Sequence, residues 1–381
     1  MKNVLAAAIL VLALLAPGRT KAEPEDKEKL PALIFYASYK GDVVSNFNGG
    51  IKTGSTYLGL ADLFLEFDTE RAKLWKGGSF MLHASNTHGG EPSAELIGDF
   101  QVVSNIEAGN HTFLYELWYS HRFGKIHGTF GLQDLNAEFA ASDFGGLFLN
   151  SSFGIHSVIA DNVAAPIFPL TSPGITICWD ATDRFNLKTA LYKGSPVDFD
   201  RNPYNVEWDL NHLHGLLWVT EANFHCSDNH DCAEILKFGF FYHEHSSEVE
   251  TEDDDLEYDY GFYAVGDHRI SPSREDGKGL SIFYQLGFSP RNDNIAYFGT
   301  GIHYSGLFSK KVSDTFGLAM ARGIMTEEAA KDETTIELTY KYQLNKLLYI
   351  QPDLQYVINP GGTGQNLDNA FVGIVRFGLE F

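Results

Sequence analysis

The sequence is poor in cysteine, in basic residues and in long apolar runs. Its 381 residues include 3 cysteines, and 28 Lys plus Arg stand against 50 Asp plus Glu, for a formal net charge of −22. This excess of negative charge repels phosphate, so nucleic acid is excluded as a partner. Beyond residue 22 no stretch approaches the ~18 consecutive apolar residues that indicate a transmembrane helix. A protein that crosses a membrane with helices is therefore excluded too.

The long apolar run that does exist lies at the N-terminus and is typical of an export signal. Lys2 gives a positive start, Val4–Ala16 is apolar throughout, and Ala22 closes a "TKA" cleavage site. The run is shorter than the ~20 residues of a membrane-spanning helix. We expect residues 1–22 to be a cleaved signal peptide and residues 23–381 to form the exported domain.

The few cysteines suit an oxidising compartment. Cys226 and Cys232 flank a turn-like stretch at C-x5-C spacing, which favours one local disulfide. A zinc site with His225 and His230 is the alternative, but the spacing matches no zinc motif. Cys178 is expected to be an unpaired strand residue. We predict no resident metal and no cofactor.

What the chain has in abundance is aromatic residues and glycine, which favour strands and turns. Aromatics make up 14%, with 29 Phe and 18 Tyr, and there are 37 Gly. Apolar residues alternate with polar ones, as in "TTIELTYKYQL" and in the terminal "FVGIVRFGLEF", so each strand has two different faces. Sixteen segments follow this pattern: 32–43, 55–68, 78–88, 111–123, 125–134, 172–180, 184–193, 211–225, 233–243, 257–266, 278–289, 294–308, 315–325, 334–344, 347–358 and 369–381.

The connections between these segments alternate between short and long. Short ones lie at 124–125, 310–314 and 345–346, and long ones at 89–110, 135–171, 194–210, 244–256 and 359–368. A soluble β-sandwich or β-helix would explain the alternation of apolar and polar residues within each strand. It would not explain the regular alternation of short and long connections. Outer-membrane barrels have both, with apolar residues toward lipid and polar residues toward the lumen. We therefore predict an all-β fold: an up-and-down antiparallel transmembrane β-barrel of about sixteen strands.

The terminal Phe381 fits this class. A terminal aromatic is a mark that outer-membrane barrels share, and in that class it is read by the barrel assembly machinery, which we expect as a partner.

A barrel of this size encloses a water-filled bore. The third long outer loop, 135–171, contains Phe139, Phe144, Phe148 and Phe153, which are too apolar for a loop left in water. We predict that this loop folds into the lumen and narrows it.

Four blocks in the same order resemble the carbohydrate-selective porins of the OprB family: Tyr39–Leu63, Gly98–Tyr119, Leu135–Gly154 and Leu348–Gly362. The resemblance implies an outer-membrane channel for passive diffusion of monosaccharides such as glucose and of similar polyols, with the third outer loop in the pore.

The charge of this loop departs from the family pattern. The family's narrow region is rich in arginine, whereas residues 135–171 contain no Lys or Arg but carry Glu138, Asp143 and Asp161. We expect a passage that favours neutral or weakly cationic solutes over anions.

A sugar offers hydroxyls in its ring plane and apolar C–H faces above and below. Carboxylates accept from the hydroxyls, Lys and Arg donate to them, aromatic rings stack on the C–H faces, and binding must stay weak enough for release. Each candidate has an alternative interpretation as an ordinary solvated or structural polar residue of a barrel interior. The candidates are Glu116, Trp118, Arg122, His83, Lys188, Lys341, Asp353 and Arg376 on strands, and Glu107, Glu138 and Asn150 on loops.

Two further polar groups stand out. The acidic run Glu244–Asp259 is expected in an outer loop, either as a solvated face or bridged by divalent cations to lipopolysaccharide. His243 and His245, with His212 and His214, are spaced to share a strand face. Metal binding is one interpretation of these histidines, and polar barrel positions are the one we adopt.

Three other classes of protein share some of these features. An outer-membrane enzyme would need a placed nucleophile, but the sequence has no G-x-S-x-G or similar elbow, so we predict that the protein is not an enzyme. A closed structural or adhesive barrel is a second alternative, and a family member for other small neutral or cationic solutes is a third. The sequence is compatible with a homo-oligomer and leaves the oligomeric state open.

Overall fold

The computed structural model describes residues 31–208, 215–225, 235–246, 256–271, 278–308, 314–326 and 331–381. The expected signal peptide (1–22), the Cys226–Cys232 pair, His212 and His214 lie outside the described residues.

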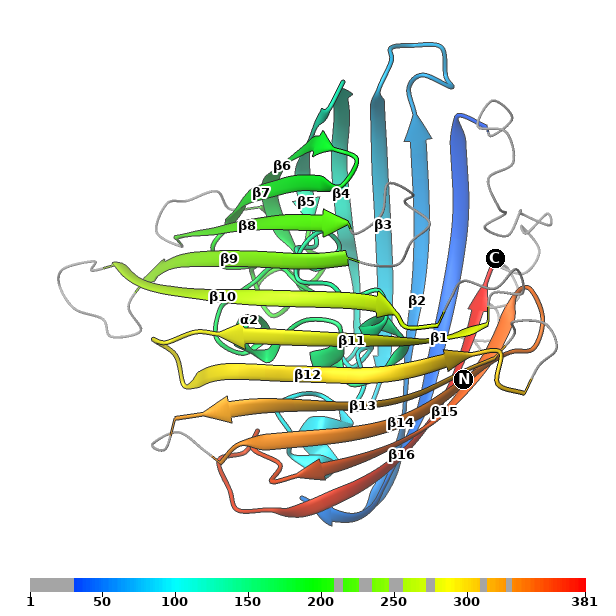
Figure 1. Ribbon diagram of the computed structural model, residues 1–381, viewed down its shortest axis with the longest axis vertical. Helices are drawn as coiled ribbons and strands as arrows, with labels where there is room; N and C mark the ends of the chain where they lie inside the picture. Colours follow the sequence, from blue (N-terminus) through cyan, green and yellow to red (C-terminus); the bar gives the residue numbers. More distant parts are fainter. Residues whose placement is uncertain are drawn as a thin grey trace.

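Within the described residues the chain forms sixteen strands and a few helical turns (Figure 1). The strands are β1 (Leu33–Gly50), β2 (Gly54–Asp68), β3 (Gly78–Gly89), β4 (His111–Phe123), β5 (Ile126–Gln133), β6 (Ser172–Thr182), β7 (Phe185–Lys193), β8 (Leu216–His225), β9 (Ile235–Ser246), β10 (Leu256–Arg269), β11 (Gly279–Phe288), β12 (Asn294–Ser305), β13 (Asp314–Met325), β14 (Glu333–Gln343), β15 (Leu348–Ile358) and β16 (Asp368–Glu380). The helical turns are η1 (Ser93–Ile97), η2 (Gly145–Leu147), η3 (Ser151–Phe153) and α2 (Ser157–Ala160).

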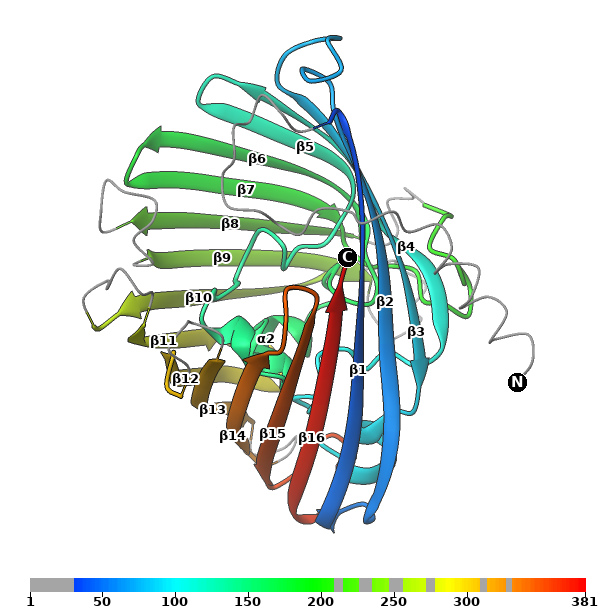
Figure 2. The same ribbon diagram turned by 90° about the vertical axis from the view of Figure 1, so that its right-hand side faces the viewer.

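The strands close into an antiparallel barrel in chain order, and β16 pairs with β1 to complete the ring (Figures 1 and 2). Val43 lies opposite Val375 in this seam, and the backbone N–H of Phe381 donates to the carbonyl oxygen of Ala37 at 2.9 Å. Closure pairs every strand edge. An open edge would expose unpaired backbone N–H and C=O groups to lipid, where they cannot form hydrogen bonds. The predicted fold is confirmed. β1 is longer than expected, because its pairing with β16 continues to Gly50.

The two faces of the strands differ as the alternation predicted. On β15, Leu354 is 42% exposed while its neighbours Asp353 and Gln355 are 3% and 0% exposed. Exposed apolar side chains recur on the outer face of nearly every strand, where a bilayer would cover them. No helix among the described residues is long and apolar enough to cross a membrane.

The alternation is interrupted on β4. Strict alternation along the predicted strand 111–123 would place Phe113, Tyr115 and Leu117 on one apolar face. Leu117 is exposed, but Phe113 and Tyr115 are buried, so that part of the prediction is wrong. The cause is a β-bulge against β3, where the register shifts between His83 and Ala84. A bulge adds one residue to one strand and turns the following side chains to the other face. It brings Tyr115 and Glu116 to the inner wall together.

Candidate functional site

The inner face of the barrel carries two chain segments that pack against it. The 135–171 segment contributes apolar side chains, among them Phe139, Phe148 and Phe153, to a buried cluster with inward residues of β7–β13. The 89–110 segment does the same through Leu96, Ile97 and neighbours, against β1, β2, β15 and β16. Figure 2 shows α2 of the 135–171 segment within the ring of strands. The inner wall therefore carries buried apolar side chains where these segments cover it.

Carboxylates on the inner wall hold the backbone of the 135–171 segment. Glu221 of β8 accepts from the N–H of Ala140 at 2.8 Å. Asp267 of β10 accepts from Ser142 Oγ at 2.5 Å and from the N–H of Asp143 at 3.0 Å. Glu337 of β14 accepts from the N–H groups of Leu149 at 2.6 Å and Asn150 at 3.0 Å. Hydrogen bonds to carboxylates are stronger than neutral ones, so three strands fix the path of one segment.

The 89–110 segment is also held by hydrogen bonds to carboxylates of the inner wall. Glu333 of β14 accepts from the N–H groups of Phe100 and Gln101, both at 3.1 Å. Arg376 of β16 forms two 2.7 Å bonds to Asp42 of β1, and Ser104 of the segment also donates to Asp42 at 2.7 Å. This buried pair joins the barrel seam to the inner segment.

Glu107 holds its own segment together. Its carboxylate accepts from the N–H of Ser93 at 3.0 and 3.2 Å. Burial, together with the negative charge of Asp99, raises the pKa of Glu107 to about 8. The folded protein therefore keeps a proton on Glu107 at pH values where the unfolded chain, with a glutamate pKa near 4.3, has lost it.

We expect Glu107→Gln to flatten the pH dependence of stability. A raised carboxyl pKa means that stability is lost as pH rises from about 4.5 to about 8. The amide mimics the protonated form at every pH, so the variant should melt higher than the wild type at pH 8 and close to it at pH 5. Melting of the detergent-solubilised barrel at both pH values tests this. Glu95→Gln, an exposed position of the same segment, should change neither value.

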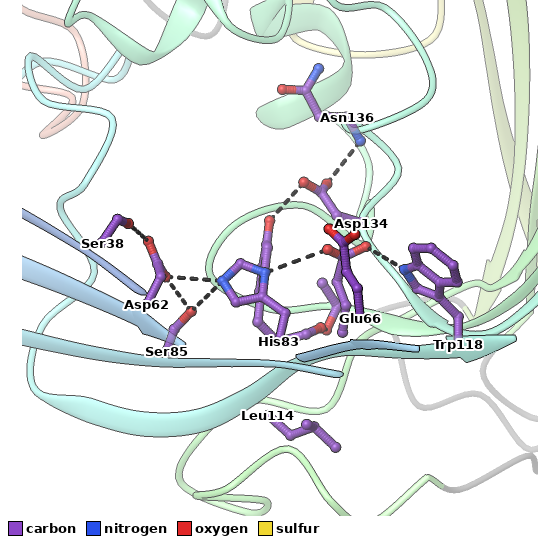
Figure 3. A network of polar contacts seen from close by, with 12 residues as sticks. Ser38, Asp62, Glu66, His83, Ser85, Leu114, Trp118, Asp134 and Asn136 are labelled. Carbon is purple, nitrogen blue, oxygen red and sulfur yellow. Dashed lines mark hydrogen bonds and ion pairs between the residues drawn. The ribbon is translucent and has the colours of Figure 1, made fainter. Parts of the chain in front are cut away.

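A polar patch lies on β2–β4 (Figure 3). We call Asp62, Glu66, His83, Glu116 and Trp118 the β2–β4 patch. His83 Nε2 lies 3.0 Å from Asp62 Oδ1, and His83 Nδ1 lies 3.5 Å from Glu116 Oε2. Trp118 Nε1 donates to Glu116 Oε1 at 3.1 Å. These bonds orient one imidazole and one indole beside three carboxylates on the inner wall.

The root of the 135–171 segment abuts this patch (Figure 3). Asp134 accepts from Tyr115 OH at 2.7 Å and from the N–H of Asn136 at 2.8 Å. Burial raises the pKa of Asp134 to about 7. At the other end of the segment, Thr171 donates to the carbonyl oxygen of Tyr115 at 2.5 Å. Both ends of the segment are thus fastened to the bulge of β4.

The structure brings three of the predicted passage residues, His83, Glu116 and Trp118, into this patch. Glu138 and Lys188 form a 2.8 Å ion pair that ties the 135–171 segment to β7.

The other predicted residues are dispersed. Asn150 is buried and caps η3 by accepting from the N–H of Ser152 at 3.1 Å. Asp353 accepts from Gln355 Nε2 at 3.2 Å beneath the inner segments. Glu107 and Arg376 hold the 89–110 segment, as described above. Arg122 lies near the short 124–125 turn and pairs with Asp180 at 2.8 Å.

Lys341 lies toward the end of β14, with its Nζ 4.1 Å from the centre of the Tyr349 ring. It lines an interior cavity of about 420 Å³ with Asp143, Phe144 and His303. The tip of the 135–171 segment therefore borders open space on this side.

The sequence did not identify the anchoring carboxylates Glu221, Asp267, Glu333 and Glu337, or the patch residues Asp62 and Glu66. The alternation pattern does place each of these residues on the polar face of its strand, which is the face expected toward the lumen. Nothing in the alternation separates an anchor from a solvated carboxylate, since their backbone partners are far away in sequence. Cys178, expected to be unpaired, is a buried free thiol in the described part of the chain.

A closed ring of strands with an apolar outside and a polar inner wall defines an outer-membrane β-barrel of the porin class. Residues 52–381 match the carbohydrate-selective porin, OprB family, and the chain belongs to that family. The family and the fold point to a channel in the outer membrane rather than to an enzyme. The resemblance seen in the sequence is confirmed.

Known proteins are similar to the chain in sequence or in fold. Porin B of Pseudomonas aeruginosa is 22% identical over 408 residues, which cover 91% of this chain and 87% of that protein. The high-pH structure of Pseudomonas putida OprB has a TM-score of 0.78 at 19% identity, and the match covers 92% of this chain and 94% of that one. The outer membrane channel DcaP of Acinetobacter baumannii shares the fold more distantly, with a TM-score of 0.58 at 8% identity over 92% and 97% of the chains.

Proposed function

We propose that the barrel is a channel for passive diffusion of small neutral sugars, monosaccharides such as glucose and similar polyols, past a narrow part of the lumen between the 135–171 segment and the β2–β4 patch. The observation that carries the proposal is this patch. Trp118 donates to Glu116, and His83 is bonded to both Glu116 and Asp62, on the wall from which the segment departs. An indole face suits the C–H face of a sugar, and carboxylates suit its hydroxyls. The membership in a carbohydrate-selective family points the same way.

The charges of the lumen favour neutral and cationic solutes over anions. Lys188 is bonded to Glu138, Lys237 donates to the carbonyl oxygen of Ala141 at 2.7 Å, and Arg376 is paired with Asp42. These cations are engaged in holding the inner segments, whereas the β2–β4 patch contributes three carboxylates to one imidazole. An anion that approaches this wall meets repulsion.

The channel is tested by reconstitution into liposomes. We expect glucose and an uncharged amino acid to enter faster than gluconate, and reversal potentials across a salt gradient to indicate cation preference. Absence of solute entry would favour a closed barrel. Anion preference would contradict the charge argument while leaving a channel intact.

Within the channel, Trp118→Ala is expected to weaken glucose binding a few-fold to about tenfold, because stacking on an aromatic ring contributes roughly 0.5–1.5 kcal/mol. The measurement is the glucose concentration that half-blocks the ion current through single channels. Trp179→Ala is the matched control, since that indole lies on the outer face of β6 and is 47% exposed. Equal loss in both variants would remove Trp118 from the sugar path.

Other features of the proposal follow from the class of protein. Residues 1–22 act as a cleaved export signal, the barrel assembly machinery inserts residues 23–381 as one domain, and the outer face contacts lipid and lipopolysaccharide. A homo-oligomer is compatible with this arrangement. A channel for other small neutral or cationic solutes is the alternative, and it is favoured if the uncharged amino acid passes while glucose does not block the current.

A further inference from the structure

Two histidines and an aspartate meet on the inner face of β9 and β10, near the ends of these strands. His243 and His245 are two residues apart on β9, so they share one face, and their rings stack with centroids 5.1 Å apart. Asp259 of β10 lies directly opposite His243 in the strand register. One ligand atom from each of the three residues lies within 4.8 Å of the other two.

The surroundings of His243 fix which of its nitrogens carries the proton. Its Nε2 lies 2.5 Å from the carbonyl oxygen of Gly194, and a carbonyl oxygen can only accept, so Nε2 must donate. Nδ1 then carries the lone pair. It is buried and has no hydrogen-bond partner among the described residues, in a side chain that is 3% exposed. Histidines that bind metals almost always donate their other ring N–H to a carbonyl or carboxylate in this manner.

The other two groups complete a ligand set. His245 Nε2 lies 2.9 Å from Asp259 Oδ2, and both side chains are mostly buried. Two imidazoles and one carboxylate suit a divalent ion of the zinc type, which accepts nitrogen and oxygen ligands and keeps further positions for water.

We propose that His243, His245 and Asp259 form a binding site for a divalent transition-metal ion such as Zn²⁺. From the sequence these histidines were expected to be polar barrel positions, and the geometry points instead to a metal that joins β9 to β10. Through the bond from His243 to Gly194, the ion would also steady the connection that follows β7. This site is separate from the β2–β4 patch, so the proposal does not depend on which solute the channel carries.

Zinc binding to the folded, chelator-treated barrel in detergent tests the site, by competition with a chromophoric chelator. Cys226→Ser/Cys232→Ser is the background for all measurements, which removes these two cysteines as competing ligands; the remaining thiol, Cys178, is buried. We expect one Zn²⁺ bound per chain, and at least a tenfold loss of affinity in His243→Ala and in Asp259→Asn. The visible absorption of bound Co²⁺ should be lost in the same variants.

The controls separate loss of a ligand from loss of the fold. His303→Ala removes a half-buried inner-face histidine outside this cluster and should bind Zn²⁺ as tightly as the background. Each variant is first shown to be folded by its heat-modifiable migration on gels. Asp259→Asn keeps the side-chain shape, so it reports on ligation even if His243→Ala does not fold. Equal Zn²⁺ affinity in the background and in folded Asp259→Asn would overturn the proposal, as would a background without Zn²⁺ binding.

Discussion

Glu337→Ala is expected to release part of the 135–171 segment and to raise the single-channel conductance. The substitution removes the acceptor of the N–H groups of Leu149 and Asn150, which lie 2.6 and 3.0 Å from the carboxylate in a buried site. Two buried donors without partners cost roughly 3 kcal/mol, or about 100-fold in the ratio of docked to released segment. We expect larger and noisier currents in planar bilayers, together with faster entry of solutes larger than a monosaccharide.

Two variants make this result specific. Glu337→Gln keeps one carbonyl acceptor and should fall between the wild type and Glu337→Ala. Glu70→Ala makes the same change on an exposed turn and should leave conductance unchanged. If Glu337→Ala folds and conducts like the wild type, the segment is not held by this carboxylate or does not narrow the lumen.

The alternation of apolar and polar residues was sufficient to predict the barrel, because lipid and lumen impose opposite demands on the two faces of every strand. It assigned Leu354 to the outside and Asp353 to the inside correctly. It failed at β4, where the bulge after Leu114 turned Phe113 and Tyr115 inward. A bulge depends on pairing with the neighbouring strand, and no periodicity along a single strand reports it.

The candidate site could be predicted only in part, because period two gives the face of a residue but not its height or its partner. Glu116 and Arg122 were assigned to the same polar face correctly, yet six residues along a strand span about 20 Å. Glu116 therefore lies in the β2–β4 patch, while Arg122 pairs with Asp180 near a short turn. Arg376 had the same appearance in the sequence as Arg122. Its partner Asp42 comes from the other end of the chain and becomes a neighbour only when the barrel closes.

Loss of the Arg376–Asp42 pair is expected to destabilise the barrel strongly. Arg376 is 5% exposed and Asp42 is 0% exposed, and two 2.7 Å bonds join them across the seam between β16 and β1. Arg376→Met leaves a buried carboxylate without its counter-charge, which costs about 3–5 kcal/mol in such sites. We expect a correspondingly lower free energy of unfolding from lipid vesicles in guanidinium and a lower temperature for loss of the heat-modifiable gel band.

The double variant Asp42→Asn/Arg376→Met separates the loss of the ionic interaction from the loss of side-chain packing. With both charges absent no buried ion is left unpaired, so most of the lost stability should return. The pair Arg122–Asp180 provides a matched comparison at similar distance, 2.8 Å, but with side chains that are 53% and 38% exposed. Water and salt screen that pair, so Arg122→Met should cost only about 0–1 kcal/mol. Equal losses at the two sites would mean that burial at the seam does not govern the strength of the Arg376–Asp42 pair.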